Sequence, residues 1–273
     1  MVGLNNKKIE LNEMRTIQMN ITEVFHDFCV KNGIMYSLGC GSLLGAIRHN
    51  GYIPWDDDID VYMKREDYKK LVKTFPSRLN EHYALVTLER DKTWNRSYGK
   101  IYDDRTFLVE PMGKLGKQLG INIDVFPIDY VPENRLKWKC YDKVRRFLQY
   151  SISAKITRLR KNRKLSLNMM VVLLKVIWSF LSVRKLGQLC DYFAQIYNGK
   201  ESKYLFETSQ GERVKEPFLA SAFDEVILHD FEDRKFYIMK GYDEYLSKSY
   251  GNYMQLPPED KRYTHNIVDA YWI

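Results

Sequence analysis

Four aspartates occur within five positions of the chain, between Asp56 and Asp60, and apolar residues lie on both sides of them. Runs of like charge are normally solvated, so this one calls for a chemical explanation. The letters DIDVYM predict a strand, in which alternate side chains point to the same face. Asp58 and Asp60 would then project together, while Ile59 and Val61 point into the core behind them.

A pair of neighbouring carboxylates suits a divalent metal ion. Two such groups repel one another unless a cation lies between them. Aspartate oxygens, supplemented by substrate phosphates and water, are ligands that Mg²⁺ and Mn²⁺ prefer. Asp58 and Asp60 therefore predict a metal site, with a solvated acidic strand end as the alternative. Asp56 and Asp57 would either support these ligands or be merely solvated.

Upstream of the aspartates, Gly41 and Ser42 form a candidate phosphate site. They follow a predicted short strand, IMYSL, and lie at the start of a short helical segment that contains SLLGAIRH. Free N–H groups at a helix N-terminus, together with a hydroxyl, can bind phosphate, although most Gly-Ser pairs are plain turns. A phosphate site followed by a carboxylate pair is typical of metal-assisted phosphoryl or nucleotidyl transfer.

The stretch GSLLGAIRHNGYIPWDDDIDVYMKREDY resembles the signature of the LicD family, the phosphorylcholine transferases of bacterial surface glycans. That family belongs to the DNA polymerase β-like nucleotidyltransferase superfamily. The superfamily pattern is a Gly-Gly or Gly-Ser turn followed by Asp-hydrophobic-Asp-hydrophobic, which Gly41-Ser42 and residues 58–61 match. The interval between the two parts is longer than is usual in the superfamily and resembles that of LicD. Residues 98–106 and 240–262 are also similar to LicD blocks.

The resemblance also implies a third carboxylate and a reaction. NIDVFPID is similar to the family's third-carboxylate strand, so Asp124 would join Asp58 and Asp60 as a catalytic metal ligand, or serve as a base. The ion, Mg²⁺ or Mn²⁺, would bridge the phosphates of CDP-choline or a related CDP-alcohol. A sugar hydroxyl of a lipid-linked glycan or teichoic-acid precursor would attack, and CMP would leave.

Several alternatives to this reaction stay open. The same chemistry could use CDP-glycerol or CDP-ribitol, and a nucleotidyltransferase proper would use an NTP and release pyrophosphate. A degenerate binding module without activity is a further alternative. The intact set of Asp58, Asp60 and Asp124 argues against degeneracy.

Three further residues are candidates for binding the donor. Arg48 could contact phosphate, since guanidinium geometry suits phosphate oxygens, or form a salt bridge with a nearby aspartate. Lys100 could face the donor phosphates or be solvated. Trp55 could line the pocket and stack on cytosine or choline, or simply pack beside Pro54. His49 is expected to be structural.

The elements that must position these residues predict an α+β fold with mixed helices and strands. Apolar residues at helical spacing predict an amphipathic helix from about Lys8 to Asn32. Strands are predicted at HYALVTLER, SYGKIYD and INIDVFPID, and a helix at REDYKKLVKTF. We interpret residues 1–132 as a nucleotidyltransferase-like core, a small mixed sheet flanked by helices, and 133–200 as a basic helical segment. Residues 201–273 would pack back on the core and include a hairpin, a short helix and a Pro-Pro stop.

Charge is distributed unevenly along the 273 residues. The net charge is +8, yet residues 134–185 carry 15 Lys and Arg against one acid, Asp142, so the remainder is acidic. RLRKNRK, beside the apolar run MMVVLLKVIWSFL, predicts either peripheral contact with anionic lipid through residues 134–186 or a solvated basic face. Nucleic acid is disfavoured, because aromatic residues are not interleaved with the basic cluster.

The remaining features concern the compartment. The four cysteines lie far apart and form no CxxC pair, which argues against a zinc site or a disulfide framework and for a reducing environment. The N-terminus has no apolar signal region. We therefore expect a cytoplasmic location, peripheral on the inner face of the cytoplasmic membrane if the basic segment contacts lipid.

Overall fold

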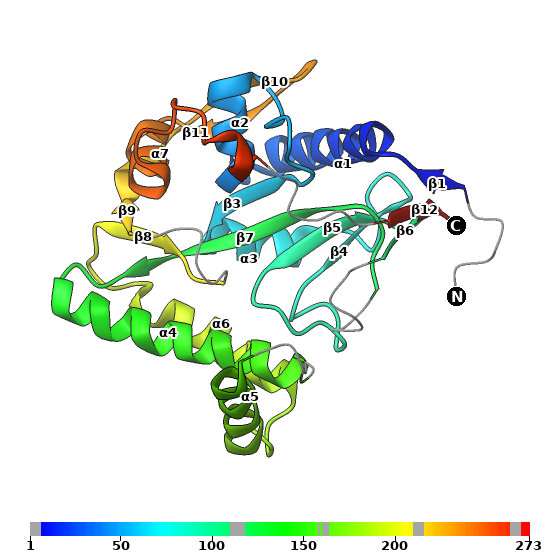
Figure 1. Ribbon diagram of the computed structural model, residues 1–273. Helices are drawn as coiled ribbons and strands as arrows, with labels where there is room; N and C mark the ends of the chain where they lie inside the picture. Colours follow the sequence, from blue (N-terminus) through cyan, green and yellow to red (C-terminus); the bar gives the residue numbers. More distant parts are fainter. Residues whose placement is uncertain (1–6, 110–117, 158, 160–163, 210–215, 263–268) are drawn as a thin grey trace.

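The computed structural model describes residues 7–109, 118–157, 159, 164–209, 216–262 and 269–273 (Figure 1). The fold is α+β, as predicted: helices cover a curled mixed sheet, and a further group of helices lies to one side. Most of the predicted basic cluster RLRKNRK, and His265 near the C-terminus, lie outside the described residues.

One mixed sheet forms the centre of the molecule, in the strand order β2-β3-β7-β5-β4. The long strand β7 pairs with β5 along its first half and with β8 along its second, and β9 follows β8. Only the pairing of β3 with β7 is parallel among these described pairs. The strands are β2 (Ser37–Leu38), β3 (Asp60–Lys64), β4 (Tyr83–Val86), β5 (Gly99–Asp103), β7 (Asn122–Val131), β8 (Tyr204–Glu207) and β9 (Phe218–Leu219).

Helix α1 (Leu11–Asn32) packs on β5 and β7 and ends as the sequence predicts. It begins after the predicted start near Lys8, because Lys8 and Ile9 form the short strand β1 instead. Its apolar positions, among them Ile17, Ile21 and Phe25, are buried. Gly33 adopts a left-handed conformation with φ 58°, and its N–H closes the last turn on the carbonyl of Val30. Helices α2 (Cys40–His49) and α3 (Arg65–Thr74) flank β3.

The basic segment is helical, as predicted, and its described residues form three helices. They are α4 (Arg135–Ile156), α5 (Leu165–Ile177) and α6 (Val183–Ala194), followed by the 3₁₀ turn η1 (Gln195–Tyr197). Helices α5 and α6 both pack against α4, and α5 extends away from the sheet (Figure 1). Within the described residues, no helix combines the length and the apolar character that crossing a membrane requires.

The C-terminal part returns to the rest of the chain at two places. β8 and β9 extend the central sheet, and β12 (Asp269–Trp272) lies between β1 (Lys8–Ile9) and β6 (Thr106–Val109). Because the first and third parts share sheets, the division into three parts stays an interpretation.

The C-terminal part contains the predicted hairpin. Its first strand, β10 (Val226–Phe231), pairs with β11 (Arg234–Met239). The 3₁₀ turn η2 (Ala220–Phe223) precedes the hairpin, while α7 (Tyr242–Tyr250) and the turn η3 (Glu259–Lys261), which begins after Pro257-Pro258, follow it.

Candidate functional site

Three of the predicted site residues form a row across the central sheet. Asp60 on β3 stands opposite Asp124 on β7, and Asp124 stands opposite Lys100 on β5. Side chains at directly paired positions of neighbouring strands project from the same face of a sheet. The fold therefore brings together residues from segments that are about 60 and 20 positions apart, and it places two carboxylates and one ammonium group side by side.

Lys100 neutralises the middle of this acidic row. Its Nζ forms an ion pair with Asp124 Oδ1 and donates to Asn122 Oδ1 at 2.8 Å. Burial by itself would lower the pKa of Lys100, but the charge of Asp124 and the hydrogen bond to it outweigh burial and raise the pKa to about 12. The side chain of Lys100 is only 12% exposed. Lys100 therefore stays positively charged at neutral pH and is not a solvated lysine.

Ser42 ties the helix after the Gly-Ser turn to the strand that carries Asp60. Its Oγ accepts a hydrogen bond from the backbone N–H of Asp60 at 2.9 Å. The N–H of Gly39, which precedes α2, donates to the carbonyl of Asp60 at 2.9 Å. Ser42 is buried, and accepting this bond leaves its own O–H able to donate. The structure thus shows that Ser42 holds the backbone of Asp60 in place. A contact between Ser42 and a phosphate stays a prediction.

Gly41 lies against the carboxylate of Asp56 at the first turn of α2. A Cβ at Gly41 would come within 2.4 Å of Asp56 Oδ2, which is closer than non-bonded atoms tolerate. Glycine therefore leaves the space that this carboxylate occupies. The preceding Cys40 has a φ of 44°, a left-handed conformation that is uncommon for residues other than glycine and clusters at functional sites. The positive end of the α2 dipole favours a carboxylate here.

The carboxylates that converge most closely are those of Asp56, Asp57 and Asp58. One oxygen from each lies within 4.8 Å of the others, and Asp57 is buried. Among the described residues, Asp60 and Asp124 do not belong to this group. Three carboxylates at this spacing repel one another, and a Mg²⁺ or Mn²⁺ ion bound by their oxygens would offset that repulsion. The residues thus fit a divalent ion, and the assignment of its ligands stays a prediction.

The expectation that Asp58 and Asp60 lie on one strand is wrong in its boundary. β3 begins at Asp60, and Asp58 lies in the preceding loop. Just before β3, the carbonyl of Ile59 accepts a hydrogen bond from the N–H of Asp124 on β7, at 2.9 Å. Before Ile59, the carbonyls of Pro54, Asp56 and Asp57 accept hydrogen bonds from side chains of α1.

Two residues of α1 hold this loop, and the sequence reading did not identify either of them. The guanidinium of Arg15 donates to the carbonyls of Pro54 and Asp56 and lies 4.7 Å from the ring centre of Tyr52. The amide of Gln18 donates to the carbonyl of Asp57 at 2.9 Å.

A signal for these residues was present in the sequence. Arg15 and Gln18 interrupt the apolar face of α1 beside Met14 and Ile17, and Gln18 is 4% exposed. A buried polar side chain on a core-facing position needs hydrogen-bond partners. Searching that face for unexplained polar residues would have suggested both.

Arg48 contacts the C-terminal segment in the structure. Its guanidinium donates to the carbonyl of Tyr253 at 2.8 Å, and its Nε donates to Nε2 of His49 at 3.0 Å. Burial lowers the pKa of His49, and the adjacent charge of Arg48 lowers it further, which favours the neutral imidazole that this bond requires. A phosphate contact by Arg48 stays a prediction.

Trp55 already has a cation over its ring. The guanidinium carbon of Arg262 lies 5.7 Å from the ring centre of Trp55, and Arg262 Nε donates to the carbonyl of Pro257 at 2.8 Å. Residues 253–262 therefore lie next to the loop that carries the aspartates. This arrangement shows that the face of Trp55 can accept a cation.

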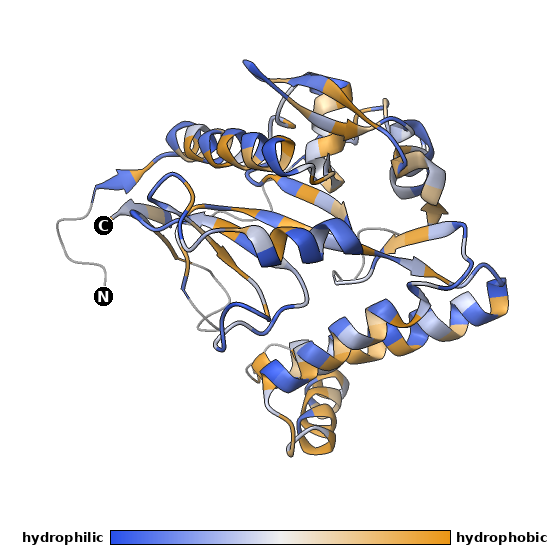
Figure 2. Cartoon of the chain, turned by 180° about the vertical axis from the view of Figure 1, so that it is seen from behind, coloured by the Kyte–Doolittle hydropathy of each residue, from blue (hydrophilic) through white to orange (hydrophobic). Residues whose placement is uncertain are grey.

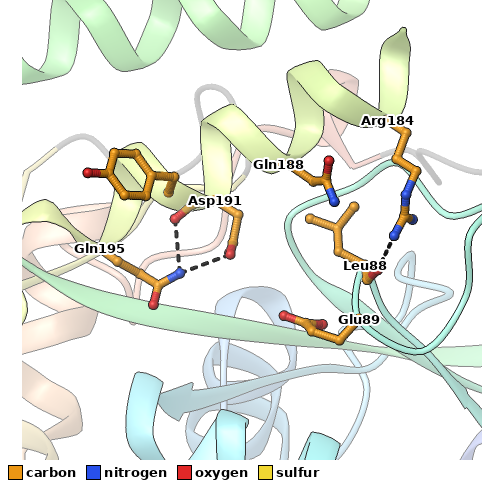
Figure 3. Close-up of a pocket in the computed structure, with 7 residues that line it drawn as sticks. Leu88, Glu89, Arg184, Gln188, Asp191 and Gln195 are labelled. Atoms are coloured by element: carbon orange, nitrogen blue, oxygen red, sulfur yellow. Dashed lines mark hydrogen bonds between the residues drawn. The ribbon is translucent and has the colours of Figure 1, made fainter.

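A cavity of about 430 Å³ lies elsewhere, between the end of β4 and α6 (Figure 3). Its wall residue Asp191 accepts a bond from Arg65, which also pairs with the buried Asp129. Asp129 is five residues beyond Asp124 on β7, or roughly 17 Å along the strand. The cavity is thus separate from the acidic row. It is lined by Leu88, Glu89, Arg184, Gln188, Asp191, Tyr192 and Gln195.

The chain is similar in sequence to known proteins along nearly its full length. Residues 33–158 match the family model described as LicD/FKTN/FKRP, nucleotidyltransferase domain. The chain is 36% identical, over 279 aligned residues, to the lipopolysaccharide cholinephosphotransferase LicD of Haemophilus influenzae; this covers 97% of the chain and 99% of the relative. An uncharacterized protein of Rickettsia typhi is 37% identical over 131 residues, 48% of this chain and 40% of that protein. Asp58, Asp60 and Asp124 all lie within residues 33–158.

Proposed function

Because this chain belongs to the LicD family, we propose that it is a phosphotransferase that moves phosphocholine, or a similar phosphoalcohol, to a sugar hydroxyl of a cell-surface glycan. The observation that carries the proposal is the similarity along nearly the full length to a lipopolysaccharide cholinephosphotransferase. The acidic row and the adjacent cluster supply side chains that suit this chemistry. The proposed donor is CDP-choline, and the proposed acceptor is a lipid-linked glycan such as a lipopolysaccharide precursor.

The proposed reaction is a displacement at the choline-bearing phosphorus. The sugar oxygen forms a new bond to that phosphorus, and the bond from it to the oxygen that joins the two phosphates breaks. CMP leaves with the electron pair of that bond, and the hydroxyl proton passes to a carboxylate. The protein forms no covalent intermediate in this scheme, so positioning and electrostatic stabilisation supply most of the rate enhancement.

Asp56, Asp57 and Asp58 would hold Mg²⁺ or Mn²⁺ beside Asp60, as the convergence of their carboxylates supports. A bound ion would supply positive charge to the donor's phosphates. The N-terminal turn of α2, with Gly41 and the hydroxyl of Ser42, is the proposed contact for phosphate oxygens. Asp60, buried at the start of β3, would fix the geometry of the loop that carries the other ligands.

Asp124 is the proposed acceptor of the hydroxyl proton. Its ion pair with Lys100 holds the carboxylate on the face of the sheet that carries Asp60. Lys100 would in addition lend positive charge to the donor phosphates next to Asp124.

The test is to incubate the protein with Mg²⁺, an acceptor glycan and a panel of CDP-choline, CDP-glycerol, CDP-ribitol and NTPs. Release of CMP from CDP-choline, with choline phosphate on the glycan, supports the proposal. Release of CMP from another CDP-alcohol alone would show that this alcohol, and not CDP-choline, is the donor. Release of pyrophosphate from an NTP would show that the protein is a nucleotidyltransferase instead. Asp58→Asn should abolish turnover, whereas the control Asp230→Asn, an exposed carboxylate on β10, should not.

A further inference from the structure

Helix α5 exposes apolar side chains around most of its circumference. Of its 13 residues, the structure buries only Leu174. Leu173 is 58% exposed and Val176 is 65% exposed, and Figure 2 shows the helix coloured largely as hydrophobic. A helix with apolar residues on all sides is normally enclosed by protein or lipid. The exposed set is Leu165, Leu167, Met169, Met170, Val172, Leu173, Val176 and Ile177.

The apolar surface continues from α5 onto α4. The ring of Trp178, which follows α5, lies with its centre 6.2 Å from that of Phe147 on α4 and 6.2 Å from that of Phe180. Phe180 is 75% exposed and Tyr150, one turn beyond Phe147, is 50% exposed. We call α5 together with these four aromatic residues the α5 surface. Monomeric soluble proteins seldom expose a contiguous apolar area of this kind without a partner.

Positive charge accompanies the α5 surface. Lys137, Lys139 and Lys143 are exposed on α4, and Lys164 is exposed at the start of α5. The single acid of residues 134–185, Asp142, is engaged by Arg145 at 2.6 Å and by Arg146 at 2.7 Å. Positive charge therefore predominates on the helical segment that carries the α5 surface.

We infer that the α5 surface binds the surface of an anionic lipid bilayer. Its apolar residues suit the acyl region, aromatic rings such as Trp178 favour the interface, and the lysines of α4 suit lipid phosphates. At 13 residues, α5 is about 20 Å long, too short to span the roughly 30 Å hydrocarbon core, so it would lie in the plane of the interface.

Charge decides between a bilayer and other occupants. A second copy of the chain would bring two segments of like charge together, which is unfavourable. Nucleic acid binds polar, cationic grooves, whereas the centre of the α5 surface is apolar. The inference deepens the proposed function, since a glycan acceptor carried on lipid would be presented at such a surface.

The test is flotation of the full chain with vesicles of phosphatidylcholine, with and without one quarter phosphatidylglycerol. We expect binding only to the anionic vesicles. The double variant Leu173→Glu, Val176→Glu should lose it, because exposed positions can take the charge without disturbing the fold. The triple variant Lys137→Gln, Lys139→Gln, Lys143→Gln should bind on the order of 100-fold more weakly. The matched control, Ile227→Glu with Leu228→Glu on β10, should bind like the parent chain.

Activity separates this inference from the proposed function. CMP release with a soluble sugar acceptor should be the same in the parent chain and in the α5 variants. Failure of the parent chain to float with anionic vesicles, or equal binding to neutral vesicles, would overturn the lipid inference whatever the activity shows. So would sedimentation showing a dimer that Leu173→Glu dissociates, because a second copy would then cover the surface.

Discussion

Asp124 and Lys100 face one another across β5 and β7, and their side chains form an ion pair within the acidic row. Both side chains are largely buried, so removing one charge leaves the other unpaired in a poorly solvated environment. This pair therefore links the stability of the sheet to the electrostatics of the proposed active site.

Replacing Lys100 by methionine should destabilise the protein. The substitution leaves Asp124 partly buried without its cation, and the expected loss in the free energy of unfolding is about 3 kcal/mol. Denaturant unfolding measures it. The control is Lys64→Met, which breaks the exposed ion pair with Asp224 and should cost less than about 1 kcal/mol. Equal losses in the two variants would contradict the role given to Lys100.

The same pair predicts a pH dependence in alkaline solution. The folded-state pKa of Lys100 is raised to about 12, above the ordinary lysine value of 10.5. A raised pKa means that the folded state holds its proton more tightly, so the stabilisation is complete below pH 10.5 and is lost as the pH rises towards 12. Unfolding followed from pH 9.5 upward should show the parent chain and Lys100→Met converging in stability. A constant difference would refute the linkage.

Gly41→Ala should lower activity by displacing a neighbouring carboxylate. The added methyl would overlap Asp56 Oδ2, and the flexible carboxylate must turn away from the cluster with Asp57 and Asp58. We expect at least about a tenfold fall in kcat/KM, equivalent to about 1.4 kcal/mol of transition-state stabilisation. The stability of the fold should change little.

A double-mutant cycle tests this explanation of Gly41. If the alanine acts through Asp56, the activity of Gly41→Ala, Asp56→Ala should equal that of Asp56→Ala alone. Additive losses would show instead that the methyl group disturbs α2 or a bound phosphate directly.

Arg15→Met should weaken the use of metal without unfolding α1. The guanidinium holds the carbonyls of Pro54 and Asp56, so its loss frees the loop that carries the acidic cluster. The Mg²⁺ concentration for half-maximal activity should rise several-fold, while methionine keeps the apolar packing of the stem. Thr16→Ala, on the solvent side of the same turn, is the control and should leave that concentration unchanged. An unchanged requirement in Arg15→Met would exclude a positioning role.

Local pattern was sufficient to predict the elements and the acidic residues. The body of α1, its end at Gly33, a strand that contains Asp60 and the strand that carries Asp124 follow from side-chain spacing and turn residues, because burial and backbone sterics act within each segment. The family resemblance, confirmed by similarity over nearly the full length, selected the same aspartates.

Only the tertiary structure decided how these residues meet. Which position of β5 stands opposite Asp124 depends on the register of strands distant in the chain, and that register is set by packing of the whole sheet. The clamp of Arg15 on the loop, and the placing of Asp58 outside β3, likewise arise from contacts between α1 and residues about 40 positions away. No periodicity within a segment encodes such contacts, because they satisfy polar groups that become neighbours only when the chain is folded.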